Sequence, residues 1–137
     1  MRSFRRNHSQ SLRSGVAAAE FAVCFPVVVL IVLATIEACT MVFLKQSLTV
    51  AAYEGARTAI SLNATTAQAE QSAQQILTER RVRGGTVSMT PSNLAGVNAG
   101  EYIEVEVSAP ATLNSVVPIT FYRGRNLKAS ATMMREF

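Results

Sequence analysis

A long apolar run near the start of the chain limits what this protein can fold into more than any other feature. Between Glu20 and Glu37 lie 16 residues without a charge, and the next charged residue after Glu37 is Lys45. At about 1.5 Å per residue, a helix over residues 16–44 is roughly 43 Å long, which exceeds the ~30 Å hydrocarbon core of a bilayer. We therefore predict a transmembrane helix at residues 16–44.

The positive charge of the chain is concentrated ahead of this run. The net charge is +4, but residues 1–15 hold four of the 13 basic residues and no acidic one, and residues 16–137 carry nine charges of each sign. A basic flank before an apolar span keeps an N-terminus in the cytoplasm. We predict a disordered basic leader at 1–15, a single-pass membrane protein with a cytoplasmic N-terminus and an exported C-terminal domain, and no nucleic-acid partner.

The entrance of the apolar run contains a glutamate, which is costly inside a bilayer and calls for a partner. Glu20 lies five residues after Gly15 and precedes Phe21. In this respect the chain resembles the type IV prepilins, whose peptidase cuts after such a glycine. Over residues 15–57 it resembles the TadE-like family, the minor pilins or pseudopilins of Tad (tight-adherence) pili. The resemblance is carried by Gly15 to Phe21, Pro26, Ile36-Glu37, Gln46-Ser47-Leu48-Thr49 and Ala52-Tyr53-Glu54-Gly55-Ala56-Arg57.

This resemblance implies a protein of a bacterial inner membrane whose C-terminal domain is periplasmic, and a prepilin cleavage site between Gly15 and Val16. It also implies that Glu20 and Phe21 serve subunit assembly or peptidase recognition, with Glu20 of one subunit neutralising the new Val16 amine of the next. The implied partners are a prepilin peptidase, other pilin subunits, the inner-membrane assembly platform and the lipid bilayer, in a pilus used for adhesion or secretion. Glu37 matches a family glutamate, and the sequence leaves open whether it reaches the membrane interface or contacts a neighbouring helix.

Other interpretations of the N-terminal region remain open. The chain could be an uncleaved single-pass membrane scaffold or sensor with a small periplasmic domain. An ordinary signal peptide has a shorter apolar region than this one, and a lipoprotein signal would have to use Cys39 after Glu37. Cys24 and Cys39 lie about 22 Å apart along a helix, which is too far for a disulfide. Pro26 should kink or loosen the helix.

The residue types present argue against catalysis in the exported part. The chain contains no aspartate, and its one histidine, His8, lies in the leader, so Ser-His-Asp and Cys-His catalysis lack a base and zinc lacks ligands. Glu104 and Glu106 would stand about 7 Å apart on one face of a strand, a separation that glycosidase carboxylates can have. The same spacing is typical of the solvated face of an amphipathic strand. We expect no enzymatic activity and no cofactor.

Helical periodicity continues beyond the apolar run. Residues 45–62 predict an amphipathic continuation of the helix, and residues 63–137 an exported α+β domain against which that continuation packs. The predicted apolar stripe is Leu44, Leu48, Ala51 or Ala52, Gly55, Ala59 and Leu62. A capping box at Thr65 to Gln68 predicts the start of a second helix, and Gly84-Gly85 its end. Arg80, Arg81 and Arg83 would then occupy its last turn.

The period changes from helix to strand after these glycines. We predict strands at Thr86 to Thr90 and Tyr102 to Ser108, a short strand at Ile119 to Tyr122, and a last strand whose inner face is Leu127, Ala129, Ala131 and Met133. The predicted fold class is therefore α+β and pilin-like, with a long N-terminal helix, a second helix and a three- or four-stranded antiparallel sheet.

Overall fold

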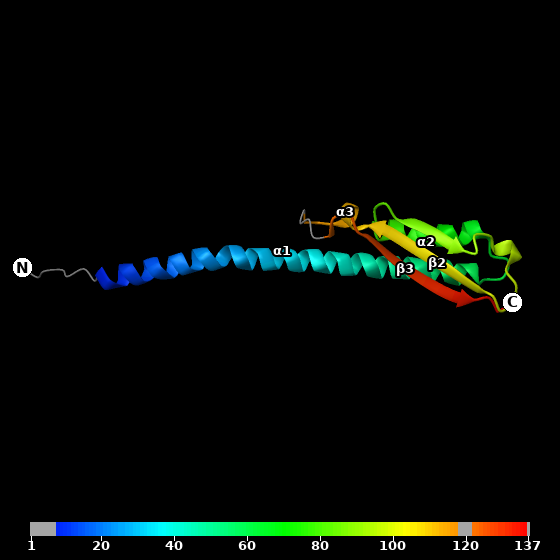
Figure 1. Cartoon of the computed structure of the whole chain (residues 1–137), viewed down its shortest axis with the longest axis horizontal. Coiled ribbons are helices and arrows are strands. Elements are labelled where there is room, and N and C mark those ends of the chain that lie inside the picture. The colour runs from blue at the N-terminus through cyan, green and yellow to red at the C-terminus, as the bar shows by residue number, and fades with distance from the viewer. Residues whose placement is uncertain (1–7, 118–121, 137) are drawn as a thin grey trace, which may run out of the picture. The chain divides into compact units, whose positions relative to one another are not determined.

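The computed structural model describes residues 8–117 and 122–136. Over these residues the elements are α1 (His8–Ala59), α2 (Thr66–Glu79), β1 (Thr86–Thr90), the 3-10 helix η1 (Leu94–Gly96), β2 (Tyr102–Pro110), α3 (Ala111–Asn114) and β3 (Asn126–Met134). Figure 1 labels α1, α2, α3, β2 and β3. The chain divides into two compact units, Met1–Ile36 and Glu37–Phe137. The predicted α+β class, with a long apolar helix, a second helix and an antiparallel sheet, is confirmed.

In the first unit, the described residues 8–36 all belong to α1. The prediction of a disordered leader is therefore wrong for residues 8–15. Starting a helix is the costly step and extending one is cheap, so the strongly helical apolar run can propagate backward through Ser-Gln-Ser-Leu-Arg. The helix also continues through Pro26.

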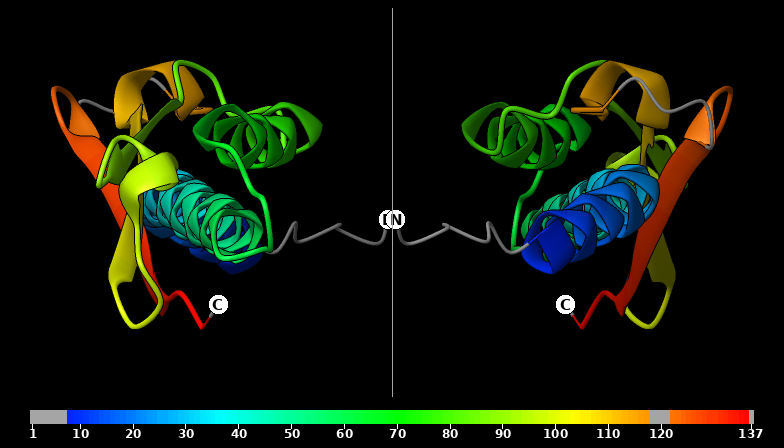
Figure 2. Two further views of the ribbon diagram at one scale, coloured as in Figure 1. Left: turned by 90° about the vertical axis from the view of Figure 1, so that its right-hand side faces the viewer. Right: turned by 90° about the vertical axis from the view of Figure 1, so that its left-hand side faces the viewer.

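The second unit has its core between the sheet and two helices. In Figure 2, which looks along α1, the sheet lies to one side of α1 and α2 lies nearby. From α1 the core takes Met41, Leu44, Leu48, Ala51, Ala52, Ala56 and Ala59, and from β2 it takes Ile103, Val105, Val107 and Ala109. The predicted packing of the α1 continuation against its own domain is confirmed. The stripe is shorter than predicted, because α1 ends at Ala59 and Leu62 is 73% exposed.

Gly55 marks the closest approach of three elements. A Cβ atom placed on Gly55 would lie 3.1 Å from Ala73 Cβ on α2 and 3.2 Å from Val105 Cγ1 on β2. Both distances are shorter than ordinary carbon contacts. A residue without a side chain therefore lets α1, α2 and β2 pack together at this level.

The start of α2 is the one predicted, and its end is not. Thr65 accepts a hydrogen bond from the Gln68 backbone N–H, and the Gln68 side chain accepts one from the Thr65 N–H, which completes the capping box. The helix ends at Glu79, before Gly84-Gly85. Arg81 adopts a positive φ of 56°, and Val82 N–H donates to Leu77 O at 2.8 Å, the pattern of a Schellman cap. The three arginines therefore follow α2 instead of occupying its last turn.

The sheet has the order β1-β2-β3 and is antiparallel throughout. Thr86 pairs with Ser108, and Tyr102 pairs with Met134. The first two predicted strands are confirmed, with β2 extending two residues further to Pro110. Leu127, Ala129, Ala131 and Met133 lie on the more buried face of β3, as predicted. The predicted short strand at 119–122 falls largely on residues 118–121, outside the described residues.

Candidate functional site

The predicted processing site lies on an exposed part of α1. Gly15 and Val16 are both exposed, and a Cβ atom on Gly15 would meet nothing within 4 Å. The conformation of Gly15 is helical, which any residue type can adopt. The packing of the folded chain therefore gives no reason for a glycine at position 15.

Glu20 and Phe21 lie one turn further along the same helix. Glu20 is exposed, and no hydrogen bond or ion pair of its carboxylate is found among the described residues. Phe21 is 66% exposed, and its ring centroid lies 5.5 Å from that of Phe25. This part of the helix thus presents a carboxylate without an intramolecular partner, next to exposed aromatic rings.

The apolar helix has the length and composition of a membrane span. Among the described residues, it is the one helix with this length and composition, over Gly15–Ala59. Its most apolar 18-residue stretch has a mean hydropathy of 2.6, and none of that stretch is buried. Val23, Leu30 and Ile31 are each more than 60% exposed. Such a continuous exposed apolar surface is typical of contact with lipid or with other apolar helices.

Glu37 has partners that the sequence did not indicate. Its side chain is 2% exposed within the second unit. Ser115 Oγ donates to Glu37 Oε1 at 2.7 Å, and Val117 N–H donates to Glu37 Oε2 at 3.3 Å. Within the chain, the carboxylate is therefore engaged by hydrogen bonds that neither alternative from the sequence included. It ties α1 to the segment that follows α3.

The partners of Glu37 lie 78 and 80 residues further along the chain. No local pattern at Ser115 or Val117 distinguishes them from other loop residues. The signal that could have led to them is the cost of a buried carboxylate, which requires hydrogen-bond donors somewhere in the fold. The sequence analysis argued for a partner only at Glu20, and it identified no donor for Glu37.

The two carboxylates considered from the sequence as a catalytic pair, Glu104 and Glu106, lie on the open face of the sheet. Glu104 is exposed, and Glu106 forms an ion pair with Lys128 Nζ at 2.9 Å. Pairing with a lysine on the neighbouring strand is the usual environment of a carboxylate on a solvated sheet face. Over residues 8–117 and 122–136, no three His, Cys, Asp or Glu side chains are grouped so that they could hold a metal ion. Cys24 and Cys39 are both exposed free thiols.

The site residues on α1 fall within one recognisable segment, which begins at Gly15 and includes Glu20 and Glu37. Residues 15–57 match the family of TadE-like proteins. This match confirms the resemblance over the residues that carried it. The TadE-like segment lies entirely within α1 and ends two residues before the helix does. No curated protein and no solved structure matches the chain.

The structure separates the predicted site residues into two groups. Gly15, Val16, Glu20 and Phe21 lie within two turns of one another on the exposed apolar part of the TadE-like segment. Glu37 belongs to the second unit, where its contacts are intramolecular. The first group is available to partners, and Glu37 is a structural residue of the domain.

Proposed function

We propose that the protein is a minor pilin or pseudopilin of a Tad pilus, cleaved after Gly15 by a prepilin peptidase and taking part in pilus assembly for adhesion or secretion. In this proposal α1 holds the protein in the inner membrane before assembly, with the N-terminus cytoplasmic and the second unit periplasmic. The observation that carries the proposal is the exposed Glu20, which has no partner among the described residues and lies near the start of the segment 15–57 that matches TadE-like proteins.

Burial in the second unit limits the part of α1 that is available to lipid. Glu37, Met41 and Leu44 are buried in that unit, whereas nearly all side chains from Val16 to Ile36 are exposed. The 21 residues from 16 to 36 make roughly 32 Å of helix, close to the ~30 Å hydrocarbon core. We place the membrane segment at residues 16–36, shorter than the 16–44 expected from hydropathy alone.

Cleavage would change the electrostatics around Glu20. In the uncleaved chain Glu20 lies in the interior of α1, where the helix dipole gives a carboxylate no benefit. After cleavage, Val16 would carry an ammonium group and Glu20 would lie near the new helix N-terminus, where negative charge is favourable. In a staggered assembly, Glu20 could also pair with the Val16 amine of the next subunit. Such a pair is far less costly in an apolar environment than either charge alone.

The intact mass and N-terminal sequence of the full-length protein, co-expressed with the cognate prepilin peptidase, test the cleavage. We expect a mature chain that begins at Val16, and an uncleaved chain when the peptidase is absent. Gly15→Leu should abolish processing without disturbing the fold, because a side chain at position 15 meets open space. Gly96→Leu is the matched control, since a Cβ at Gly96 also meets nothing within 4 Å. A chain that begins at Met1 in the presence of active peptidase would favour the uncleaved membrane scaffold or sensor instead.

Assembly is tested separately with Glu20→Gln. The variant should still be cleaved and membrane-bound but should be depleted in sheared pilus fractions. Glu70→Gln, which removes an exposed carboxylate from α2, should behave as the unmodified protein does. Equal recovery of all three proteins in the pilus fraction would show that the Glu20 carboxylate has no part in assembly.

A further inference from the structure

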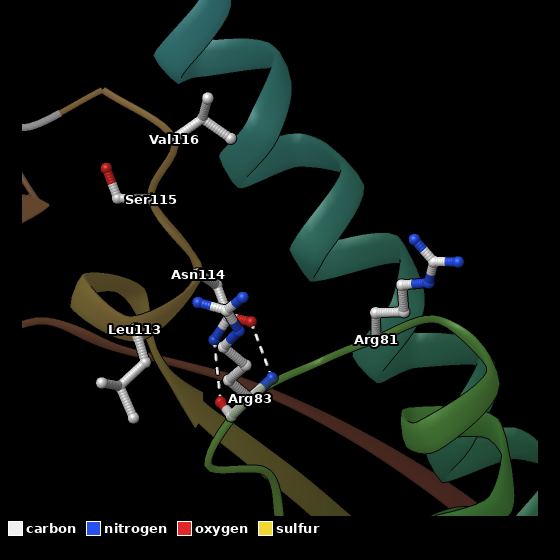
Figure 3. A pocket seen from close by; sticks show the side chains of 6 residues that line it. All are labelled: Arg81, Arg83, Leu113, Asn114, Ser115 and Val116. Carbon is white, nitrogen blue, oxygen red and sulfur yellow. Dashed lines mark hydrogen bonds between the residues drawn. The ribbon is translucent and has the colours of Figure 1, made fainter.

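A pocket in the second unit lies between the segment after α2 and the segment around α3. It has a volume of about 260 Å³ and is lined by Arg81, Arg83, Leu113, Asn114, Ser115 and Val116. Figure 3 shows the two arginines coming from the first of these segments and the other four residues from the second. Neither the TadE-like segment nor the proposed pilin function accounts for this pocket.

The positive charge in the pocket is not neutralised within the described part of the chain. Arg81 and Arg83 are exposed, and neither guanidinium has a carboxylate partner among the described residues. The Asn114 side chain accepts a hydrogen bond from Arg83 N–H at 2.8 Å and donates to Arg83 O at 2.9 Å, as the dashed lines in Figure 3 show. These bonds hold the Arg83 backbone and leave its guanidinium available to an anion.

Exposed aliphatic side chains adjoin these charges. Leu113 is 52% exposed and Val116 is 72% exposed. Leu113 is held against the Gly84 backbone, where an added Cβ would come within 2.8 Å of Leu113 Cδ1. A soluble ligand such as free phosphate gives no reason for two aliphatic side chains beside the arginines. A phospholipid does, because it offers an anionic phosphate next to apolar chains.

The contacts of Glu37 place this pocket near the start of the second unit. Ser115, which lines the pocket, donates to Glu37, and Glu37 directly follows the apolar segment 16–36 in the chain. We propose that the pocket binds the phosphate headgroup of an anionic phospholipid of the bilayer that α1 spans, with Leu113 and Val116 entering the interface. This inference rests on the membrane anchoring in the proposed function.

The test uses the full-length protein in lipid nanodiscs and a tryptophan reporter. The chain contains no tryptophan, so a single one can be introduced at a chosen position. Val116→Trp reports on the pocket, Val28→Trp on the apolar segment, and Asn98→Trp on an exposed loop before β2. Each variant is placed in equal mixtures of phosphatidylglycerol and phosphatidylcholine, in which either one or the other lipid carries bromine as a quencher.

We expect the tryptophan at position 116 to be quenched about three times more by brominated phosphatidylglycerol than by brominated phosphatidylcholine. Arg81→Asn with Arg83→Gln should reduce this ratio to about 1, since the attraction of the two arginines for the anionic headgroup is then lost. Asparagine is chosen because it tolerates the positive φ of Arg81. Arg80→Gln, which removes an exposed arginine that does not line the pocket, should leave the ratio unchanged.

The reporters separate this inference from the proposed function. If the tryptophan at position 28 is quenched and that at position 116 is quenched no more than that at position 98, the headgroup site is wrong and the membrane anchor stands. If the tryptophan at position 28 is not quenched by either lipid, the anchor itself is wrong. A lipid preference at position 116 that survives loss of both arginines would also overturn the proposal.

Discussion

The hydrogen bonds of the buried Glu37 predict how substitutions at position 37 change the stability of the domain. Ser115 Oγ lies 2.7 Å from Glu37 Oε1 and 2.7 Å from Val117 O. A hydroxyl group has one proton, so Ser115 donates fully to only one of these oxygens at a time. A glutamine at position 37 would remove this competition. Its amide could donate to Ser115 Oγ, Ser115 could then donate to Val117 O, and the amide oxygen could still accept from Val117 N–H.

Three variants at this site should therefore differ in the free energy of unfolding. Glu37→Ala removes both hydrogen bonds to the side chain and leaves Val117 N–H without its acceptor, which should cost about 2–3 kcal/mol. Glu37→Gln should retain the stability of the unmodified protein to within about 0.5 kcal/mol, because the bonds to Ser115 and to Val117 N–H can both still form. Ser115→Ala removes one of the two bonds to Glu37 and should cost about 1–2 kcal/mol.

Resistance to a short pulse of protease, measured against urea concentration for the full-length protein in detergent micelles, gives these free energies. Glu54→Gln is the matched control on the same helix. Glu54 lies 3.9 Å from Arg57 in an exposed ion pair, so its loss should cost less than about 0.5 kcal/mol. The reasoning would be refuted if Glu37→Gln were as damaging as Glu37→Ala, or if Glu37→Ala were no worse than Glu54→Gln.

Three further predictions concern the second unit and use the same assay. Leu48→Ala removes a side chain that is 0% exposed and should cost about 2.7–5 kcal/mol, and a loss below 1 kcal/mol would contradict its place in the core. Thr65→Ala removes the capping side chain of α2 and should cost about 1 kcal/mol, whereas no loss would mean that the cap is not formed. Arg81→Gly relieves a positive φ of 56° and should stabilise the domain by about 0.5–1 kcal/mol, and destabilisation would show that φ is not positive there.

Local patterns predicted much of this fold because their determinants are close in the sequence. The two residues of the capping box, Thr65 and Gln68, are three positions apart, so four consecutive residues are enough to predict the start of α2. The alternation of Ile103, Val105 and Val107 determines which face of β2 is buried. The residues of the predicted cleavage site and its surroundings, Gly15 to Phe21, are likewise contiguous in the sequence, and their role stays a prediction.

Features that depend on distant residues were missed. The end of α2 was placed at Gly84-Gly85, because a left-handed arginine at position 81 carries no signal in the sequence. The membrane segment proposed here, residues 16–36, is shorter than the 16–44 predicted from hydropathy, because hydropathy does not distinguish lipid contact from burial against a sheet. Met41 and Leu44 are apolar residues that are buried in the second unit, and only the fold shows this burial. The partners of Glu37 depend on how α3 and the segment after it pack.

The core joins residues that are far apart in the sequence, and this separation affects the rate of folding. Its first helix, residues 37–59 of α1, packs with strands that come much later in the chain, and Ala129 on β3 belongs to the same core. β2 lacks its second neighbour until residues 126–134 are available to pair with it. In the topology proposed above, the native core cannot close until nearly all of the domain has crossed the membrane. Folding that waits for such long-range pairings is slow compared with the folding of helical bundles. The chain should therefore cross the membrane extended and fold only on the far side.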